Sequence, residues 1–408
     1  MHRWISHATY VSSFVFLGSL FITACSDSKV DSGGRATQLP IDCRDASNTD
    51  PICVSSVAVG TGTPLGDGFE TGGIVDGNRV IVPAVFGNTM YGLHAINMET
   101  KERSVVSGVY KDPRTGEKIV GSGPVFTSLK FITKGPDGYY AFGTDRDHPT
   151  PGRWGSPKLP DAFVYRVDPA NGNRSIVLDF GEPAAACTTR SGLQVFPMKE
   201  AIFSAEERTR LVLTFGADGT MYVPVDGGDD KHRLSGVAAF KDGACHIVSL
   251  DDSQDKDDVG SGITLAIRQL ELPISALRYS NGALYAMSVE KSLIRIDVNS
   301  GNREVISSSE SDEMVGTGPG IHRGYMEIAP DGTIWTSGGN MGESMLTAID
   351  PNTGNRTGYY VDLPNQTSHS GGTIFGFDPS KPFIFIEDRG VVVLEYSTGN
   401  GNVLAREH

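Results

Sequence analysis

Short runs of alternating apolar and polar residues follow one another along most of the chain, separated by turn-forming residues. Examples of the apolar runs are Phe163–Val167, Leu293–Ile296 and Leu346–Ile349. Alternation with a period of two is typical of β-strands that bury one face, because successive side chains point to opposite faces of a sheet. No stretch shows a sustained helical period. The pattern therefore predicts an all-β protein built from many short strands.

One turn sequence is repeated between these runs. Asp350–Arg356 reads Asp-Pro-Asn-Thr-Gly-Asn-Arg, close copies are Asp168–Arg174 and Asp297–Arg303, and weaker copies are Asn97–Arg103 and Glu395–Asn400. Gly and Asn accept the positive φ that tight turns require, so each copy predicts a β-hairpin.

A second repeated turn has Asp or Asn followed by Gly, or in its loosest form by Pro, and then a short apolar run. Its copies are Asp76–Val80, Asp137–Tyr140, Asp218–Tyr222, Asn281–Tyr285, Asp331–Trp335 and Asp378–Phe383. An Asp-Gly pair between alternating apolar residues is a strong hairpin signal. The two turns divide the chain into six units of about four strands, at about 56–107, 122–180, 208–250, 273–307, 322–362 and 371–406. The segment 181–207 is predicted to be a loop.

Repeats of this length with four strands each are typical of a β-propeller. We therefore predict a six-bladed β-propeller, with about four antiparallel strands per blade, over residues 56–408. Gly-x-Gly sequences lie between the units, at Gly60–Gly62, Gly121–Gly123, Gly260–Gly262 and Gly316–Gly318. We expect these glycines to allow close approach of the backbone near the central axis.

Taken together, these motifs resemble six-bladed propellers of the NHL and TolB-like superfamily. The resemblance covers most of residues 56–406 and rests on Gly-Ser/Thr-Gly-Pro, Asp-Gly-x-x-Tyr/Trp and Asp-Pro-x-Thr/Asn-Gly-Asn-Arg sequences. It implies the fold only, since the matching residues form turns and pack strands, and one fold hosts many functions.

The N-terminus has the pattern of an export signal. Arg3 is followed by the apolar run Val11–Phe21, which ends at Ile22–Cys25. Ile-Thr-Ala-Cys resembles the lipobox of bacterial lipoproteins, which implies a signal peptide over residues 1–24 and palmitate-like acyl chains on Cys25. Ser26 then favours the outer membrane over the inner. The alternatives are an ordinary secretory signal or an uncleaved anchor helix, although the apolar run is short for a bilayer span.

Composition limits the location and the partners of the mature protein. Residues 25–55 are rich in Ser, Asp, Gly and Thr, and we expect a flexible tether there. The formal net charge of −14 repels phosphate backbones and anionic headgroups. We therefore expect no nucleic-acid partner, attachment to the cell envelope through the lipid, and a protein or small-molecule ligand.

Cysteine usage agrees with export. Besides Cys25 the chain has Cys43, Cys53, Cys187 and Cys245, an even number that is typical of an oxidising compartment. Three pairings are open, and we predict the disulfides Cys43–Cys53 and Cys187–Cys245. The second would tie the segment after the second unit to the outer strand of the third. Four free thiols are the alternative.

The loops at one end of a propeller channel are the usual place for a ligand. Two loops carry several charged or aromatic residues: Thr144–Lys158, with Arg146, His148, Arg153 and Trp154, and Asp226–Arg233, with Asp229 and His232. They predict a binding rim, with Trp154 as the apolar anchor. The alternative is two solvated surface loops. The favoured function is a binding or scaffolding module.

A metal-dependent hydrolase is the second hypothesis. Lactonases of the six-bladed fold hold a divalent cation with Glu, Asn and Asp side chains, and Glu70 or Glu327 with Asn340 and Asp388 could imitate that set. Ca²⁺ prefers such oxygen ligands. No local motif of those lactonases is matched. The acidic run Asp251–Asp258 lacks the Gly and the closing Glu of a calcium loop, so a solvated run is favoured there. No Gly-x-Ser-x-Gly or His-Glu-x-x-His occurs, which disfavours serine hydrolases and zincins.

Overall fold

The computed structural model of the chain describes residues 53–55, 61–63, 68–69, 73–86, 90–112, 115–126, 129–150, 159–180, 186–197, 213–228, 233–263, 274–288, 291–309, 314–321, 325–338, 345–360, 373–374, 383–387 and 390–394. The chain divides into two compact units, Met1–Leu39 and Pro40–His408. All of the described residues belong to the second unit, so the fold below is that of this unit alone.

The described strands form six sheets. The first sheet holds β2 (Thr61–Gly62), β3 (Gly68–Phe69), β4 (Ile74–Asp76), β5 (Arg79–Phe86), β6 (Met90–Asn97), β7 (Glu102–Asp112) and β8 (Gly116–Val120). The second holds β9 (Leu129–Gly135), β10 (Gly138–Thr150), β11 (Leu159–Val167) and β12 (Arg174–Asp179). The third holds β13 (Cys187–Thr188), β14 (Gln194–Pro197), β15 (Thr214–Phe215), β16 (Met221–Gly228), β17 (Arg233–Lys241) and β18 (Ala244–Asp252).

The remaining strands build three smaller sheets. The fourth sheet holds β19 (Ile274–Ser280), β20 (Ala283–Ser288), β21 (Ser292–Asp297) and β22 (Arg303–Ser308). The fifth holds β23 (Tyr325–Ile328), β24 (Ile334–Gly338), β25 (Met345–Ile349) and β26 (Arg356–Tyr360). The sixth joins β1 (Cys53–Ser55) to β27 (Thr373–Ile374), β28 (Phe383–Glu387) and β29 (Gly390–Leu394).

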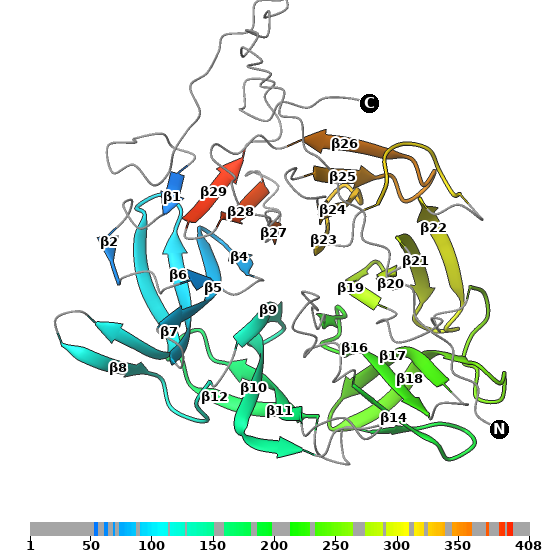
Figure 1. Ribbon diagram of the computed structural model, residues 1–408, viewed down its shortest axis with the longest axis horizontal. Helices are drawn as coiled ribbons and strands as arrows, with labels where there is room; N and C mark the ends of the chain where they lie inside the picture. The colour runs from blue at the N-terminus through cyan, green and yellow to red at the C-terminus, as the bar shows by residue number, and fades with distance from the viewer. Residues whose placement is uncertain are drawn as a thin grey trace, which may run out of the picture. The chain divides into compact units, whose positions relative to one another are not determined.

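Within a sheet, strands that follow one another in sequence pair antiparallel, as in the order β12-β11-β10-β9 of the second sheet. The early strands of successive sheets contact one another, β5 with β9, β9 with β15, β15 with β19, β19 with β23 and β23 with β27. The sheets therefore follow one another around a common axis, with their early strands innermost (Figure 1). This arrangement is a β-propeller, and the all-β prediction is confirmed. The described residues include no helix, and hence none that is long and apolar enough to cross a membrane.

The hydrophobic core lies where the faces of neighbouring sheets meet. Ile81 and Leu93 of the first sheet share a buried cluster with Ile132 and Tyr165 of the second. A second cluster joins the second and third sheets, and a third cluster joins the third, fourth and fifth. The second, third and fourth sheets are thus apolar on both faces, which explains the near-continuous apolar runs in their central strands.

The first repeated turn connects the two outer strands of a sheet. Its first residue accepts a hydrogen bond from the backbone N–H two residues ahead, with Asp168–Ala170, Asp297–Asn299 and Asp350–Asn352 distances of 2.8, 3.0 and 2.9 Å. Asp side chains stabilise turns in this way. The hairpins predicted at Asn97–Arg103, Asp168–Arg174, Asp297–Arg303 and Asp350–Arg356 are confirmed, and the copy at Glu395–Asn400 lies outside the described residues.

The last residue of the turn is a buried arginine. Three such residues, each 6% exposed, begin outer strands: Arg174, Arg303 and Arg356. Each Nε donates to a carbonyl of the loop before its sheet, that of Pro124, Ile263 or Pro319, at 2.7 Å. Each Nη1 donates to a serine hydroxyl of the preceding sheet, that of Ser107, Ser249 or Ser307, at 2.8, 3.0 and 2.7 Å. We call this arrangement an arginine clasp. It joins the first sheet to the second, the third to the fourth, and the fourth to the fifth.

The Gly-x-Gly sequences pack against the clasped hairpins. A Cβ on Gly121 would lie 1.9 Å from the carbonyl oxygen of Gly172, and one on Gly316 would lie 2.0 Å from that of Gly354. Only glycine permits such a contact. The close approach is therefore at the outer hairpin of the next sheet, and the expectation of a position near the axis was wrong.

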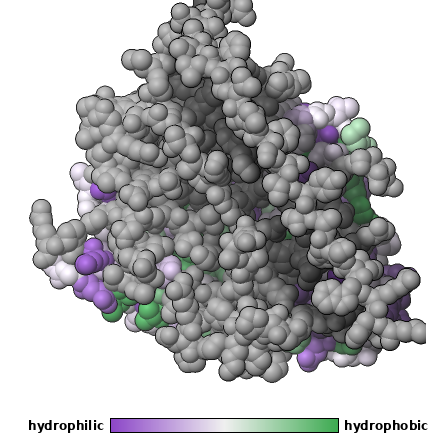
Figure 2. All heavy atoms as spheres, viewed as in Figure 1, coloured by the Kyte–Doolittle hydropathy of each residue, from purple (hydrophilic) through white to green (hydrophobic). Residues whose placement is uncertain are grey.

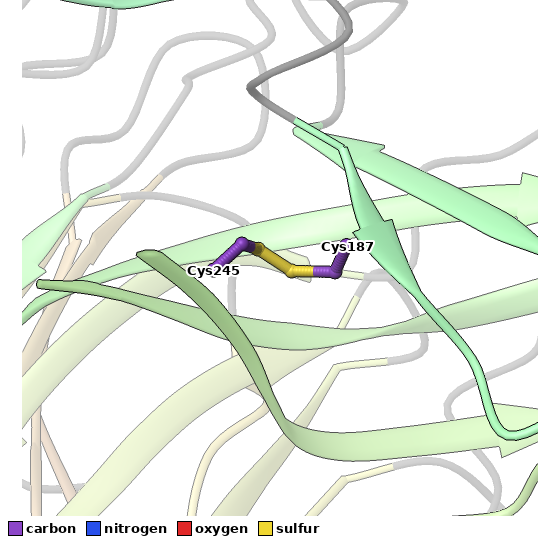
Figure 3. Close-up of a disulfide and its surroundings, with 2 residues drawn as sticks. All are labelled: Cys187 and Cys245. Atoms are coloured by element: carbon purple, nitrogen blue, oxygen red, sulfur yellow. A yellow bond between two sulfur atoms is a disulfide. The ribbon is translucent and has the colours of Figure 1, made fainter. Parts of the chain in front are cut away.

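The third sheet lacks this link to the sheet before it. Its outer hairpin is the two-residue turn Asp242–Gly243, with φ of 50° and 76°, and the described residues there form no clasp. Within this sheet, Cys187 of β13 and Cys245 of β18 form a disulfide with a Cα–Cα distance of 5.3 Å (Figure 3). This predicted pairing is confirmed. The segment 181–207, predicted to be a loop, contains β13 and β14, which extend the third sheet.

A polar cluster links the inner strands of the first two sheets. The Asp76 carboxylate accepts hydrogen bonds from Tyr139 Oη at 2.5 Å, Lys134 Nζ at 2.7 Å and Arg79 Nη2 at 3.1 Å. Burial raises the pKa of Asp76, but these hydrogen bonds outweigh it and lower that pKa to about 2. The ionised carboxylate is therefore favoured in the folded protein.

Replacing Asp76 with asparagine should lower the free energy of unfolding at pH 7 by about 1 kcal/mol, since water and salt screen the cluster. A lowered pKa stabilises the fold above the unfolded-state pKa of about 3.9, and the effect is lost as pH falls through the folded-state value of about 2. The difference in the free energy of unfolding between wild type and Asp76→Asn, measured by urea unfolding, should shrink to roughly half by pH 3. Glu304→Gln, at an exposed position, is the control. A gap that stays constant between pH 7 and pH 3 would contradict the assignment.

Candidate functional site

An open groove lies between the second and third sheets, with a volume of about 540 Å³. One wall is β12, with Ile176, Val177 and Leu178. The other wall contains Met221, Phe240 and the turn Asp242–Gly243 of the third sheet. The two walls come from neighbouring blades, so the rigid packing of the blades defines the groove.

The apolar wall of the groove is exposed. Ile176 and Val177 are each 42% exposed, and the other large apolar side chains exposed in the described part of the chain are Ile119, Val125 and Met314. These three are separated in sequence, and none of them lines the groove. At the edge of the face shown in Figure 2, hydrophilic and hydrophobic residues lie close to one another. Ile176 and Val177 are the one pair of sequence neighbours among the exposed large apolar side chains of the described residues, and an exposed apolar patch is an indicator of binding.

A β-bulge explains why two adjacent residues face the same groove. Tyr165 pairs with Ile176 and Val164 pairs with Leu178, which leaves Val177 as an extra residue in β12. Bulges re-aim a side chain relative to regular alternation. The same bulge recurs in the outer strands of three other sheets, at Val106, Val248 and Ile306.

At these other bulges, the next hairpin covers the extra residue. A Cβ on Gly172, Gly301 or Gly354 would lie 2.2, 2.4 or 2.3 Å from the carbonyl oxygen of Val106, Val248 or Ile306, respectively. Val248 and Ile306 are only 5% and 9% exposed. The groove at Val177 is therefore the equivalent position, left open because the third sheet has the short turn Asp242–Gly243.

The rim of the groove is acidic. Asp179, Asp218 and Asp242 line it together with one basic residue, Lys241. Lys241 Nζ lies 2.5 Å from Asp218 Oδ2, and this hydrogen bond lowers the pKa of Asp218 and raises that of Lys241. The pKa of Tyr140, also in the groove, is raised to about 12 by burial and by its hydrogen bond to Asp137. The groove thus combines an apolar wall with an excess of negative charge.

Glu327, a predicted metal ligand, lies on the inner strand β23 and is paired with an arginine. Arg278 of β19 donates from Nε and Nη2 to Glu327 Oε1, at 3.0 and 2.5 Å. The two side chains are 15% and 20% exposed, and the guanidinium lies 5.9 Å from the ring centre of Phe131. The arginine neutralises the carboxylate, so this geometry does not favour the metal hypothesis. Glu70, Asn340 and Asp388 lie outside the described residues.

The predicted binding rim is only partly described. Arg146 and His148 lie on β10, which extends to Thr150, so this part of the predicted loop is strand. Asp226–Gly228 likewise belongs to β16. The residues outside the described part are Arg153, Trp154, Asp229, His232, Cys25 and Cys43, while Cys53 begins β1. The rim and the first disulfide therefore stay predictions.

Backbone N–H groups donate hydrogen bonds to carboxylates of the acidic run Asp251–Asp258, which begins at the end of β18. Asp252 Oδ1 accepts from Gln254 N at 2.8 Å, and Oδ2 accepts from Lys256 N and Asp257 N at 2.9 and 2.8 Å. Asp257 accepts from the N–H and the hydroxyl of Ser191. These carboxylates therefore shape a loop, and the described residues contain no group of three acidic, His or Cys side chains placed to hold a metal ion.

Sequence reasoning did not find the groove. Ile176 and Val177 read as an ordinary strand, and the signal that distinguishes them lies elsewhere, in the short turn Asp242–Gly243. That turn replaces the longer hairpin found in the other repeats. The change in turn length between repeats is thus the sequence signal of the groove.

Comparison with known proteins gives no family. No protein-family model matches the chain, and neither does any curated protein. Solved structures do match. A protein of unknown function from Bacteroides thetaiotaomicron is 12% identical, with a TM-score of 0.45, and the match covers 83% of this chain and 74% of that one.

Two further matches are proteins with names. TolB from Acinetobacter baumannii is 8% identical with a TM-score of 0.38, covering 72% of this chain and 54% of that one. BamB from Moraxella catarrhalis is 12% identical with a TM-score of 0.36, covering 80% and 84%. Likeness at this level carries no argument about function. The β-propeller fold follows from the chain's own sheets.

Proposed function

We propose that this protein is a lipid-anchored, six-bladed β-propeller of the bacterial cell envelope that binds a protein or a small ligand. The lipobox-like sequence Ile22–Cys25 supports the anchor, and Ser26 favours the outer membrane. The pairing of β1 with β29 supports the sixth blade, because a strand from each end of the chain then completes one sheet.

The groove between the second and third sheets carries the binding function. Its volume of about 540 Å³ lies within the range of pockets that hold ligands. Ile176 and Val177 expose apolar surface to water there, and a bound partner would bury it. The arginine clasps hold other blades in fixed positions, so the scaffold around the site is preorganised, which reduces the entropy lost on binding.

Photo-crosslinking in the bacterial host tests this proposal. With benzoylphenylalanine at Val177, irradiated cells should yield discrete adducts, seen as defined mass increases of the intact protein. The same label at Glu304, an exposed residue of β22, is the matched control and should not yield them. The adducts should be in the membrane fraction, and in the soluble fraction when Cys25→Ser is added. Identical products at both positions would refute a binding groove, and an unchanged distribution with Cys25→Ser would refute the anchor.

A further inference from the structure

We propose that the groove receives a protruding turn of a partner protein, with an apolar residue at its tip and a basic residue beside it. This inference rests on the proposed binding function and specifies its ligand. It follows from the comparison of four equivalent bulges within the chain.

Three of the four bulges show what fits against them. Val106, Val248 and Ile306 are each covered by a hairpin turn of the next sheet, with a glycine against the carbonyl oxygen of the bulge. The fourth bulge, at Val177, keeps the same strand geometry. The turn that would cover it is shortened to Asp242–Gly243. A polypeptide turn is therefore the occupant for which this surface is shaped.

The chemistry of the fourth position differs from that of the clasped ones. The residue after the bulge is Ser107, Ser249 or Ser307 at the clasped positions, and each hydroxyl accepts from a buried arginine. At the fourth position it is Leu178, which is 8% exposed. No hydroxyl is available at this point to accept from an arginine, so the base of the groove suits an apolar side chain.

The charge of the lining residues is the reason to expect a basic residue of the partner at the rim of the groove. Three carboxylates line the groove, those of Asp179, Asp218 and Asp242, together with a single cation, Lys241. The net negative charge of these lining side chains attracts a lysine or arginine of the partner and repels an acidic turn. The pairing should therefore weaken as salt is added.

A displayed library of disulfide-cyclised peptides with randomised loops is the probe. It is selected on the purified mature protein and counter-selected on the Ile176→Ser/Val177→Ser variant. Both residues are exposed, so the variant should fold, and thermal melting checks this. Enriched loops should carry an apolar residue next to Lys or Arg. Their affinity, measured by fluorescence anisotropy, should fall at least about tenfold in the variant and about threefold or more in Asp179→Asn/Asp242→Asn.

Ile119→Ser, on β8, is the matched control, because it removes an exposed apolar side chain outside the groove and should leave binding unchanged. Loops that bind wild type and the double serine variant equally would overturn the inference. So would an absence of enrichment, or enrichment of acidic loops. A small-molecule adduct at Val177, together with no enriched loop, would leave the binding function standing and refute the partner turn.

Discussion

Replacing Arg303 with alanine should lower the free energy of unfolding by about 4 kcal/mol. Its Nε donates to Ile263 O at 2.7 Å, and its Nη1 donates to Ser249 Oγ at 3.0 Å. Nη2 lies 3.6 Å from Asp251 Oδ1, and these two side chains are only 3% and 13% exposed. Removing the arginine would take a cation away from this nearly buried carboxylate and would leave buried carbonyls without donors.

Urea unfolding followed by circular dichroism measures this loss. Arg295→Ala is the matched control, because Arg295 is exposed on the adjacent strand β21, and its removal should cost less than about 0.5 kcal/mol. Arg303→Lys should recover little of the stability, since an ammonium cannot reproduce the planar fork that serves several acceptors. If Arg303→Ala were as stable as the control, the clasp would contribute nothing measurable to the free energy of unfolding.

Removing the disulfide should have a comparable effect. The bond closes a loop with a sequence separation of 58 between Cys187 and Cys245. The entropy of an unfolded chain freed from such a loop predicts a loss of about 4 kcal/mol. The bond also ties β13 to β18 within the third sheet, the one sheet among the second to fifth whose described residues lack a clasp. We therefore expect the opening to concentrate within the third sheet, at β13 and β18.

The Cys187→Ala/Cys245→Ala double variant tests this expectation better than a reductant, which would also act on other cysteines. Its urea midpoint should fall, and hydrogen exchange should accelerate in β13, β14 and β18 before the fourth sheet. Ser107→Ala/Arg174→Ala, which removes the neighbouring clasp, is the comparison, and its exchange should accelerate at the first and second sheets instead. A double cysteine variant within about 1 kcal/mol of wild type would show that packing alone holds the third sheet.

The sequence was sufficient to predict the architecture because the repeated residues have local effects. Asp297 caps its own turn, Gly301 supplies a positive φ, and the alternation in β21 sets which face is buried. The role of Arg303 is not local. Its acceptors lie in another sheet, at Ser249 and Ile263. Such long-range partners cannot be read from a turn motif, so the clasp was missed and the glycines were placed at the axis.

The candidate site was predictable to a smaller extent. Charged loops were selected because polar residues carry most chemistry, but Glu327 is paired with Arg278 and Asp252 holds its own loop. The groove exists because the longer hairpin turn of the other repeats is absent between these two blades. Val177 is exposed because the distant turn Asp242–Gly243 is short, and no property of the Val177 neighbourhood in sequence reveals this.

The pairing of Cys53 with Val392 has a consequence for how the chain reaches its final form. During synthesis β1 must wait until β29 has been made, and contacts so distant in sequence form slowly. Until then the opening strand has an unsatisfied edge, which is a hazard for wrong pairing with another chain. Closure of the sixth sheet therefore follows the synthesis of β29, and the folding of the other sheets does not depend on it.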